Sequence, residues 1–155
     1  MDNKIAIHSE PIVVNTQYIR DFSFENPQAP AIFLKNEQPK VEIDLDINAK
    51  SIGDNVFEVI LGIQAKASIE NDVIFLVELQ YAGVFTVNTT NEAEKEMLLL
   101  VNCPGIIFPY ARRIISDITR DGGYPPLMIA PIDFLELYEK KRKHNDSSAG
   151  NVTIN

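Results

Sequence analysis

The chain has 155 residues and a mass of 17.4 kDa, the size of one domain. Its 22 acidic and 14 basic side chains give a formal charge of −8, so the surface repels phosphate backbones and argues against nucleic acid as a partner. Its longest apolar runs, such as Met97–Val101, are far shorter than the ~20 residues that span a bilayer. Residues 1–4 lack the basic start of a signal peptide, and the lone Cys103 fits a reducing compartment. We therefore expect a cytoplasmic protein.

The first predicted strand follows a polar, irregular segment, residues 1–11, which we expect to be flexible. The strand covers about residues 12–24, and its alternation predicts one face with Tyr18, Arg20, Phe22 and Phe24 and another with Ile19, Asp21 and Ser23. The prolines of Asn26–Pro30 end it, because proline has no N–H for the ladder. The long connection to Pro39 contains an apolar stretch, Ala31–Leu34, and loops of this length are usually functional or packed against the fold.

Three further strands are predicted at about residues 41–47, 56–69 and 73–85. The earliest of the three places Val41, Ile43, Leu45 and Ile47 on one face and the acidic Glu42, Asp44 and Asp46 on the other. The last places Phe75, Val77, Leu79 and Tyr81 inward and Ile74, Leu76, Glu78 and Gln80 outward. Short turns between these strands predict an antiparallel sheet with one apolar and one solvated face.

Three helices are predicted after the strands. Thr90 or Asn91 caps the first, which is expected to end near Asn102–Gly105. Pro109 is typical of a first helical turn, so a second helix is predicted from Pro109 to Arg120, and a third from about Asp133 to Lys143. The order predicts an α+β fold, a four-stranded antiparallel sheet with helices packed on one side.

The folded domain is predicted to cover residues 12–140. Residues 141–155 are expected to form a disordered polar tail. The basic run Lys140–Lys143 at its start is expected to be solvated, because short charge runs beside a polar tail usually are.

Residues suited to catalysis are scarce. His8 and His144 lie in the terminal segments, and Cys103 has no histidine near it in sequence, so a buried structural thiol is favoured over a nucleophile. The spacing of these residues does not match a zinc site. We therefore expect no enzyme activity, no metal and no cofactor.

A binding surface is the remaining hypothesis. The outward face of the predicted sheet combines Leu76 with acidic side chains, and this combination is a plausible dock for a basic partner. The same pattern also fits an ordinary solvated face, because single exposed leucines are common.

Three motifs resemble those of the SecB family, the bacterial protein-export chaperones. They are Tyr18–Pro30, Cys103–Arg112 and Ala130–Tyr138, the last with Ile132-Asp133 where the family usually shows Val-Asn. They occur in order across nearly the whole predicted domain.

The resemblance implies a homotetramer, a dimer of dimers, that holds unfolded preproteins in apolar grooves without ATP and delivers them to the SecA ATPase. It implies that the basic, zinc-bearing C-terminal tail of SecA binds the acidic face at Asp21, Glu25, Leu76 and Glu78. The implied client groove contains Phe33, Val41, Ile43, Leu45, Phe75 and Tyr138. The implied tetramer interface contains Tyr110, Ile114 and Ile118. One departure concerns the groove, since Glu37 stands where many members have tryptophan.

Other functions compete with a general export chaperone. A SecB-like chaperone dedicated to one client, such as an antitoxin, is one alternative, and retention of the four SecA-contact positions argues against it. A purely structural oligomerisation module and a small hydrolase are the others, and the scarcity of histidine disfavours the hydrolase.

Overall fold

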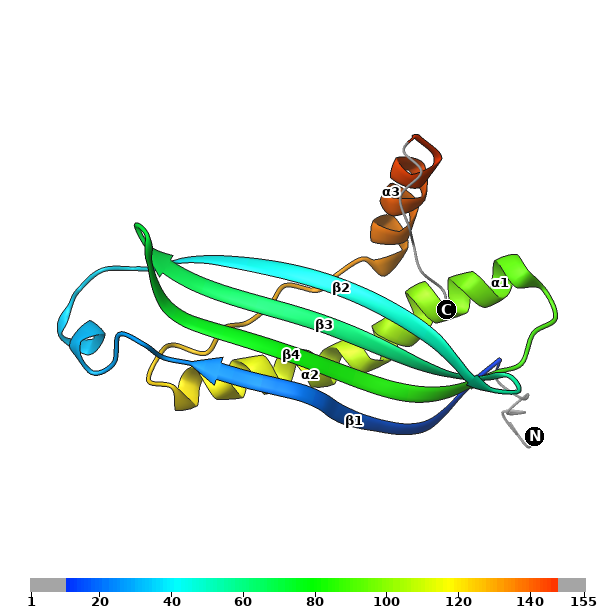
Figure 1. Cartoon of the computed structure of the whole chain (residues 1–155), viewed down its shortest axis with the longest axis horizontal. Coiled ribbons are helices and arrows are strands. Elements are labelled where there is room, and N and C mark those ends of the chain that lie inside the picture. The colour runs from blue at the N-terminus through cyan, green and yellow to red at the C-terminus, as the bar shows by residue number, and fades with distance from the viewer. Residues whose placement is uncertain (1–10, 148–155) are drawn as a thin grey trace, which may run out of the picture.

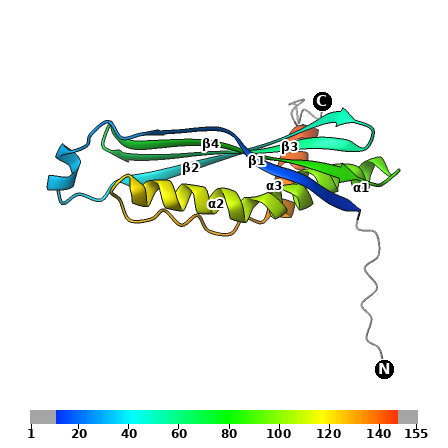
Figure 2. The same ribbon diagram turned by 90° about the horizontal axis from the view of Figure 1, so that it is seen from below.

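The computed structural model describes residues 11–147, so the expected flexible N-terminal segment, apart from Pro11, and residues 148–155 lie outside the described residues. The elements, in chain order, are β1 (Ile12–Glu25), the 3₁₀ turn η1 (Ala31–Leu34), β2 (Lys40–Gly53), β3 (Val56–Ile69), β4 (Asp72–Val87), α1 (Glu92–Met97), the π-helical turn η2 (Leu98–Asn102), α2 (Cys103–Asp121) and α3 (Phe134–Ser147). The strands form one antiparallel sheet in the order β1-β4-β3-β2. Figure 1 shows α2 running along this sheet, and Figure 2 shows it as a second layer on one side. The predicted α+β fold is confirmed.

The core lies between the sheet and α2. Alternate residues of the central strands are almost fully buried on this side, among them Leu61 in β3 and Val77 and Leu79 in β4. Ile107 and Ile115 of α2 are completely buried in the same core. The predicted inward face of β4 is therefore confirmed, and we call this side of the sheet the helix side.

β1 contains two irregularities that the sequence pattern does not reveal, one at Asn15 and one at Arg20. Asp21 pairs with Gln80 and Ile19 with Tyr81, so Arg20 is an extra residue, a β-bulge. The side-chain alternation therefore reverses at this point. Ile19, rather than Tyr18, shares the helix side with Phe22 and Phe24, and the predicted grouping of Tyr18 and Arg20 with these phenylalanines is wrong.

The helical region also differs from prediction. Asn91 caps α1 by accepting the Glu94 N–H at 3.1 Å, but no break follows near Asn102–Gly105. The π turn η2 lets the Cys103 N–H donate to the Leu98 carbonyl, and the helix continues into α2. Pro109 lies inside α2, so the prediction of a helix start there is wrong. The carbonyl that lacks its Pro109 partner belongs to exposed Gly105, where water can bind it.

The continuous helix Glu92–Asp121 is 30 residues long and apolar enough, by length and composition, to cross a membrane. Half of its most apolar window is buried inside the protein, which is typical of the core helix of a globular fold.

α3 begins after Asp133, whose carboxylate accepts the Glu136 N–H at 3.1 Å. It continues to Ser147, so residues 141–147 are helical where a disordered tail was expected. Figure 1 shows α3 projecting beyond the β2 edge of the sheet.

Candidate functional site

The outer face of the sheet brings together the four residues expected to contact SecA. Glu25 of β1 is opposite Leu76 of β4, and two residues along each strand Ser23 is opposite Glu78. Asp21 follows on the same face, opposite Gln80. Leu76 is half-buried, whereas Asp21, Glu25 and Glu78 are exposed. An apolar side chain therefore lies beside the carboxylate of Glu25 on β1 and two residues from that of Glu78 on its own strand.

The acids of β2 extend this surface across the sheet. Leu76 pairs with Lys66 of β3, and Lys66 pairs in turn with Glu42 of β2. Glu78 pairs with Gln64 of β3, and Gln64 pairs with Asp44 of β2. Asp46 follows on β2, and we call this surface of β1, β4 and β2 the acidic face. In the described part of the chain, Asp21, Glu25 and Glu78 have no ion-pair partner. Their uncompensated charge favours a basic ligand.

Glu58 of β3 lies on the same side of the sheet but is compensated. The hydroxyl of Tyr18 donates to its Oε2, and Arg20 Nη1 donates to its Oε1 at 2.5 Å. Burial, together with the hydrogen bond to Glu58, raises the pKa of Tyr18 to about 12, so the phenol stays protonated. The bulge at Arg20 makes this bridge possible by turning Tyr18 to the outer side.

The helix side carries an aromatic cluster, Phe24, Phe33, Phe75 and Tyr124. The ring centroids of Phe75 and Tyr124 are 5.0 Å apart, those of Phe33 and Tyr124 5.5 Å, and those of Phe24 and Phe75 6.2 Å. Phe75 is buried, while Phe33 is 48% exposed. The cluster thus has a buried base and a wall open to solvent, and Phe33 and Phe75 lie together as the client-groove hypothesis requires.

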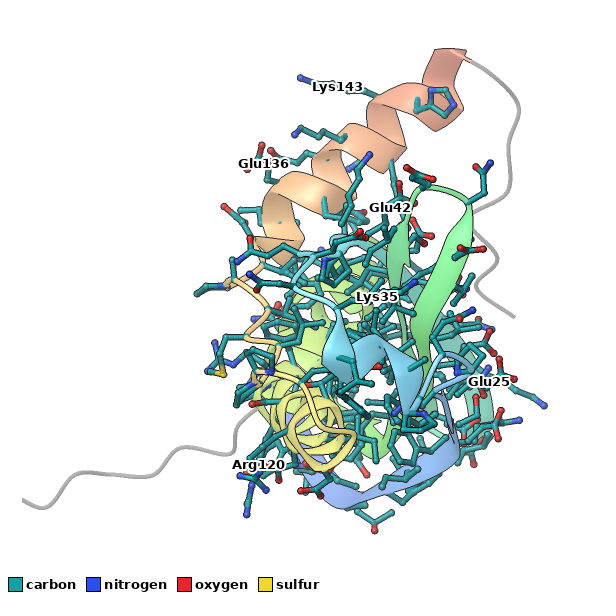
Figure 3. The ribbon with its side chains drawn as sticks, turned by 90° about the vertical axis from the view of Figure 1, so that its left-hand side faces the viewer. Glu25, Lys35, Glu42, Arg120, Glu136 and Lys143 are labelled. Atoms are coloured by element: carbon teal, nitrogen blue, oxygen red, sulfur yellow. The ribbon has the colours of Figure 1, made fainter. Side chains whose placement is uncertain are left out.

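Two glycines at the end of α2 allow these rings to come so close. A Cβ on Gly122 would lie 2.4 Å from Phe24 Cζ, and one on Gly123 would lie 2.7 Å from Phe33 Cζ. Gly123 also has φ +97°, a backbone conformation that other residues rarely adopt. Figure 3 looks onto this end of the molecule, with Lys35 of the loop after β1 between Arg120 of α2 and Glu25, which points to the opposite side.

The edge strand β2 supplies an apolar strip on the helix side. Val41 and Ile43 are 37% and 39% exposed, and Leu45 is half-buried. Small residues separate this strip from β4, since Ala67 lies between Val41 and Phe75, and Ala65 occupies the equivalent place beside Ile43. The strip and the aromatic cluster are therefore neighbours, separated only by the small side chains of Ala65 and Ala67 on β3.

Tyr138 does not join this group. It is buried on α3 beside Glu96 of α1. Burial, and then the charge and hydrogen bond of Glu96, raise its pKa. Glu96 lies near the start of the continuous helix, and Gly123 lies just after its end. The six predicted groove residues are therefore divided between the two ends of this helix, with Tyr138 at the Glu96 end and Phe33 at the Gly123 end.

Tyr110, Ile114 and Ile118 follow one another along α2. Tyr110 is 53% exposed and stacks on Tyr81 with ring centroids 6.3 Å apart, while both isoleucines are half-buried. They form a partly open apolar stripe.

Cys103 is fully buried, and burial raises the pKa of its thiol to about 12. A thiol that stays protonated near neutral pH is a poor nucleophile. Within residues 11–147, no three His, Cys, Asp or Glu side chains are grouped so as to hold a metal ion.

Several residues of this site were not singled out from sequence. Tyr124 is part of the aromatic cluster, and Asn26, which the sequence indicated only as part of the segment that ends the first strand, hydrogen-bonds to Tyr124. In the sequence, Gly122 and Gly123 come just after the predicted helix Pro109–Arg120 and have the pattern of a helix stop. A single glycine is enough to end a helix, so the second was a signal of close packing.

Comparisons with known proteins agree on one family. The family model described as preprotein translocase subunit SecB matches residues 6–145. A protein-export protein SecB of Parvibaculum lavamentivorans is 47% identical over 137 residues, 88% of this chain and 82% of that protein. One of Rhodospirillum centenum is 43% identical over 146 residues, 93% of this chain and 86% of the relative.

A solved structure shares the fold. It is a SecB-like chaperone of Mycobacterium tuberculosis in complex with a peptide from the HigA1 antitoxin. The TM-score is 0.62 at 16% identity, and the match covers 79% of this chain and 91% of that one.

Proposed function

Because this chain belongs to the SecB family of protein-export chaperones, we propose that it binds unfolded preproteins without ATP and delivers them to SecA in the cytoplasm. The observation that best supports this is the separation of two unlike surfaces by a single sheet. Exposed apolar side chains lie on the helix side, and uncompensated carboxylates lie on the acidic face. A chaperone can therefore hold a client on one surface while a second protein binds the other.

Unfolded clients would bind along the aromatic cluster and the β2 strip. Phe33, Val41 and Ile43 are each between a third and a half exposed, so an extended segment can cover them without displacing the core. Burial of apolar area contributes about 25 cal/mol per Å², whatever the client's sequence. This accounts for broad rather than specific recognition, and several such grooves on one client would raise the affinity through effective concentration.

SecA would bind the acidic face through its basic, zinc-bearing tail. Leu76 offers an apolar contact at the centre, and Asp21, Glu25 and Glu78 offer the complementary charge. Charged groups at the rim of an interface mainly increase association rate and specificity, while the apolar centre adds affinity. The zinc in this proposal belongs to SecA.

A homotetramer, a dimer of dimers, would bring the grooves of four chains together. The stripe of Tyr110, Ile114 and Ile118 is the surface that we assign to the contact between dimers, because apolar side chains on an outer helix face favour a partner. No nucleic acid and no direct membrane insertion are part of this function.

The function is tested by mixing the purified protein with a urea-unfolded secretory preprotein during dilution, without nucleotide. We expect light scattering from aggregated preprotein to be suppressed, and native mass spectrometry to give four copies of the 17.4 kDa chain. A stable monomer that leaves aggregation unchanged would refute the proposal. A protein that protects one antitoxin but no preprotein would be a dedicated chaperone instead.

A further inference from the structure

Asn26 connects the end of β1 to the end of α2. It is the first residue of the loop 26–39 between β1 and β2, which we call the crossover. Its Nδ2 donates to the carbonyl oxygen of Gly122 at 3.0 Å, and its Oδ1 accepts a hydrogen bond from the Tyr124 hydroxyl at 2.5 Å. The amide therefore uses both its donor and its acceptor on the segment after α2.

That segment is held firmly from its other side. The Tyr124 N–H donates to the Thr119 carbonyl at 3.1 Å, and the Leu127 N–H donates to Thr119 Oγ1 at 2.9 Å. Thr119 is completely buried, so these bonds are protected from water. The backbone around Tyr124 thus has a fixed position, and Asn26 adds a hydrogen bond to the far end of the side chain.

The Tyr124 ring, in turn, supports Phe33. It lies between Phe75 and Phe33, and the Phe75 side is buried. Burial also raises the pKa of Tyr124, so its hydroxyl remains a donor to Asn26. Fixing the hydroxyl oxygen fixes the long axis of the ring, and packing against buried Phe75 restricts rotation about that axis.

The backbone of Phe33 is held in the turn η1, where its N–H donates to the Pro30 carbonyl at 3.1 Å, but the crossover has little else to hold its side chain. Ile32 is buried and lines a shallow hollow with Ile69 and Ile74, on the other side of the loop. Phe33 is half exposed, and Leu34 after it is almost fully exposed. The orientation of Phe33 therefore depends on Tyr124 and on the close approach at Gly123.

We propose that Asn26 is a positioning residue for client binding, which holds Tyr124 so that Phe33 forms a fixed wall of the apolar groove. This inference rests on the proposed function, since it assigns Asn26 a role in the same groove. Asn26 itself need not touch the client. Its removal would let the Phe33 side chain move. Client binding would then be weaker, because part of the binding free energy would be used to order that side chain.

The chain contains no tryptophan, so a Phe33→Trp variant carries a single fluorescent reporter at the wall. In that background, Asn26→Ala and Tyr124→Phe should each move the emission to longer wavelength, because the indole becomes more exposed. Each change, made in the wild-type chain, should weaken binding of a urea-unfolded preprotein at least about fivefold, the effect of losing the bond between the Tyr124 hydroxyl and Asn26 that both changes remove. The Tyr124→Phe variant retains the ring, so it tests the hydrogen bond even if Asn26→Ala folds poorly.

Asn15→Ala is the matched control. It removes a side-chain hydrogen bond of 2.9 Å from Asn15 to Thr86, also from β1 but away from the groove. This variant should leave both emission and client affinity unchanged. An equal loss of affinity in Asn15→Ala would show that general destabilisation, and not positioning, is the cause.

A double variant and a conservative one complete the test. Asn26→Ala with Tyr124→Phe should be no weaker than Asn26→Ala alone, because Asn26→Ala already removes the bond to the Tyr124 hydroxyl. Asn26→Asp retains an acceptor for Tyr124 but places a carboxylate oxygen against the Gly122 carbonyl, so it should restore only part of the affinity. Unchanged client binding in Asn26→Ala, with wild-type protein binding normally, would overturn the inference. Failure of the wild-type protein to bind would instead refute the proposed function.

Discussion

The acidic face and the helix side of the sheet are built in different ways. On the acidic face, Asp21, Glu25 and Glu78 lie on two neighbouring strands, and the ladder between β1 and β4 sets their spacing. On the helix side, the aromatic cluster takes one ring from each of β1, the crossover, β4 and the segment after α2. The first surface depends on strand register alone, whereas the second depends on tertiary packing between distant segments.

This difference has a consequence for variation. A charge on a strand face can change without disturbing the fold, because exposed substitutions cost little stability. A change in the aromatic cluster must also satisfy Gly122 and Gly123, which leave no room for a Cβ. The two surfaces can therefore be separated experimentally, and the following changes test that separation.

Glu78→Lys should have the largest effect. It puts a cation where a basic ligand is expected, and a like-charge cost of about 2 kcal/mol at this partly solvated face should weaken SecA binding on the order of 30-fold. Isothermal titration calorimetry with SecA would measure this, and capture of an unfolded preprotein should be unaffected. Asp54→Lys, the same charge change in the turn between β2 and β3, is the control. Equal loss of client capture in Glu78→Lys would contradict two separate surfaces.

Ile43→Asp should produce the converse result. It places a charge on the apolar strip of β2, and the lost burial together with desolvation should weaken client binding roughly tenfold while leaving SecA binding intact. Ile52→Asp alters another exposed isoleucine of β2, near the hairpin, and should change neither. Fluorescence anisotropy of a labelled preprotein would distinguish them. Normal client binding by Ile43→Asp would remove β2 from the groove.

Salt should separate the surfaces without any mutation. Raising sodium chloride from about 50 to 300 mM should weaken SecA binding about threefold, because exposed charges are screened. Client capture should change little, since apolar burial is insensitive to this range of salt. A parallel decline of both affinities would indicate that clients are held mainly by charge.

Asp44→Asn should have the smallest effect. Asp44 lies on the acidic face two strands away from Glu78, and removal of one exposed charge should weaken SecA binding less than about twofold. Calorimetry on the same preparation would measure how far the surface extends towards β2. An effect as large as that of Glu78→Lys would move the centre of the dock to β2.

Strand parity accounts for how well each surface could be predicted. Leu76 and Glu78 share a face because they are two residues apart in a regular strand, and the pairing confirms it. Asp21 and Glu25 lie after the bulge at Arg20, so their parity is undisturbed. Tyr18 precedes it, and its predicted face is wrong, because one extra residue reverses the alternation without changing composition.

The helix side was less predictable because its neighbours are far apart in sequence. Nothing local to Asn26 indicates that it contacts Gly122 and Tyr124, about a hundred residues later. The two prolines of the long helix led to a wrong prediction of its boundaries for a different reason. Pro104 follows a π turn and Pro109 leaves exposed Gly105 unpaired, so neither breaks the helix as proline usually does.

In the proposed function, the uninterrupted helix would set the distance between the two places where the predicted groove residues lie. Phe33 lies at its Gly123 end and Tyr138 beside Glu96, and at about 1.5 Å per residue these ends are ~40 Å apart. An extended chain advances about 3.5 Å per residue at most, so a client that spans both ends would need about a dozen consecutive unfolded residues. The surface loops of a folded protein rarely reach that length. The length of one helix would thus let the protein distinguish an unfolded chain from a folded one.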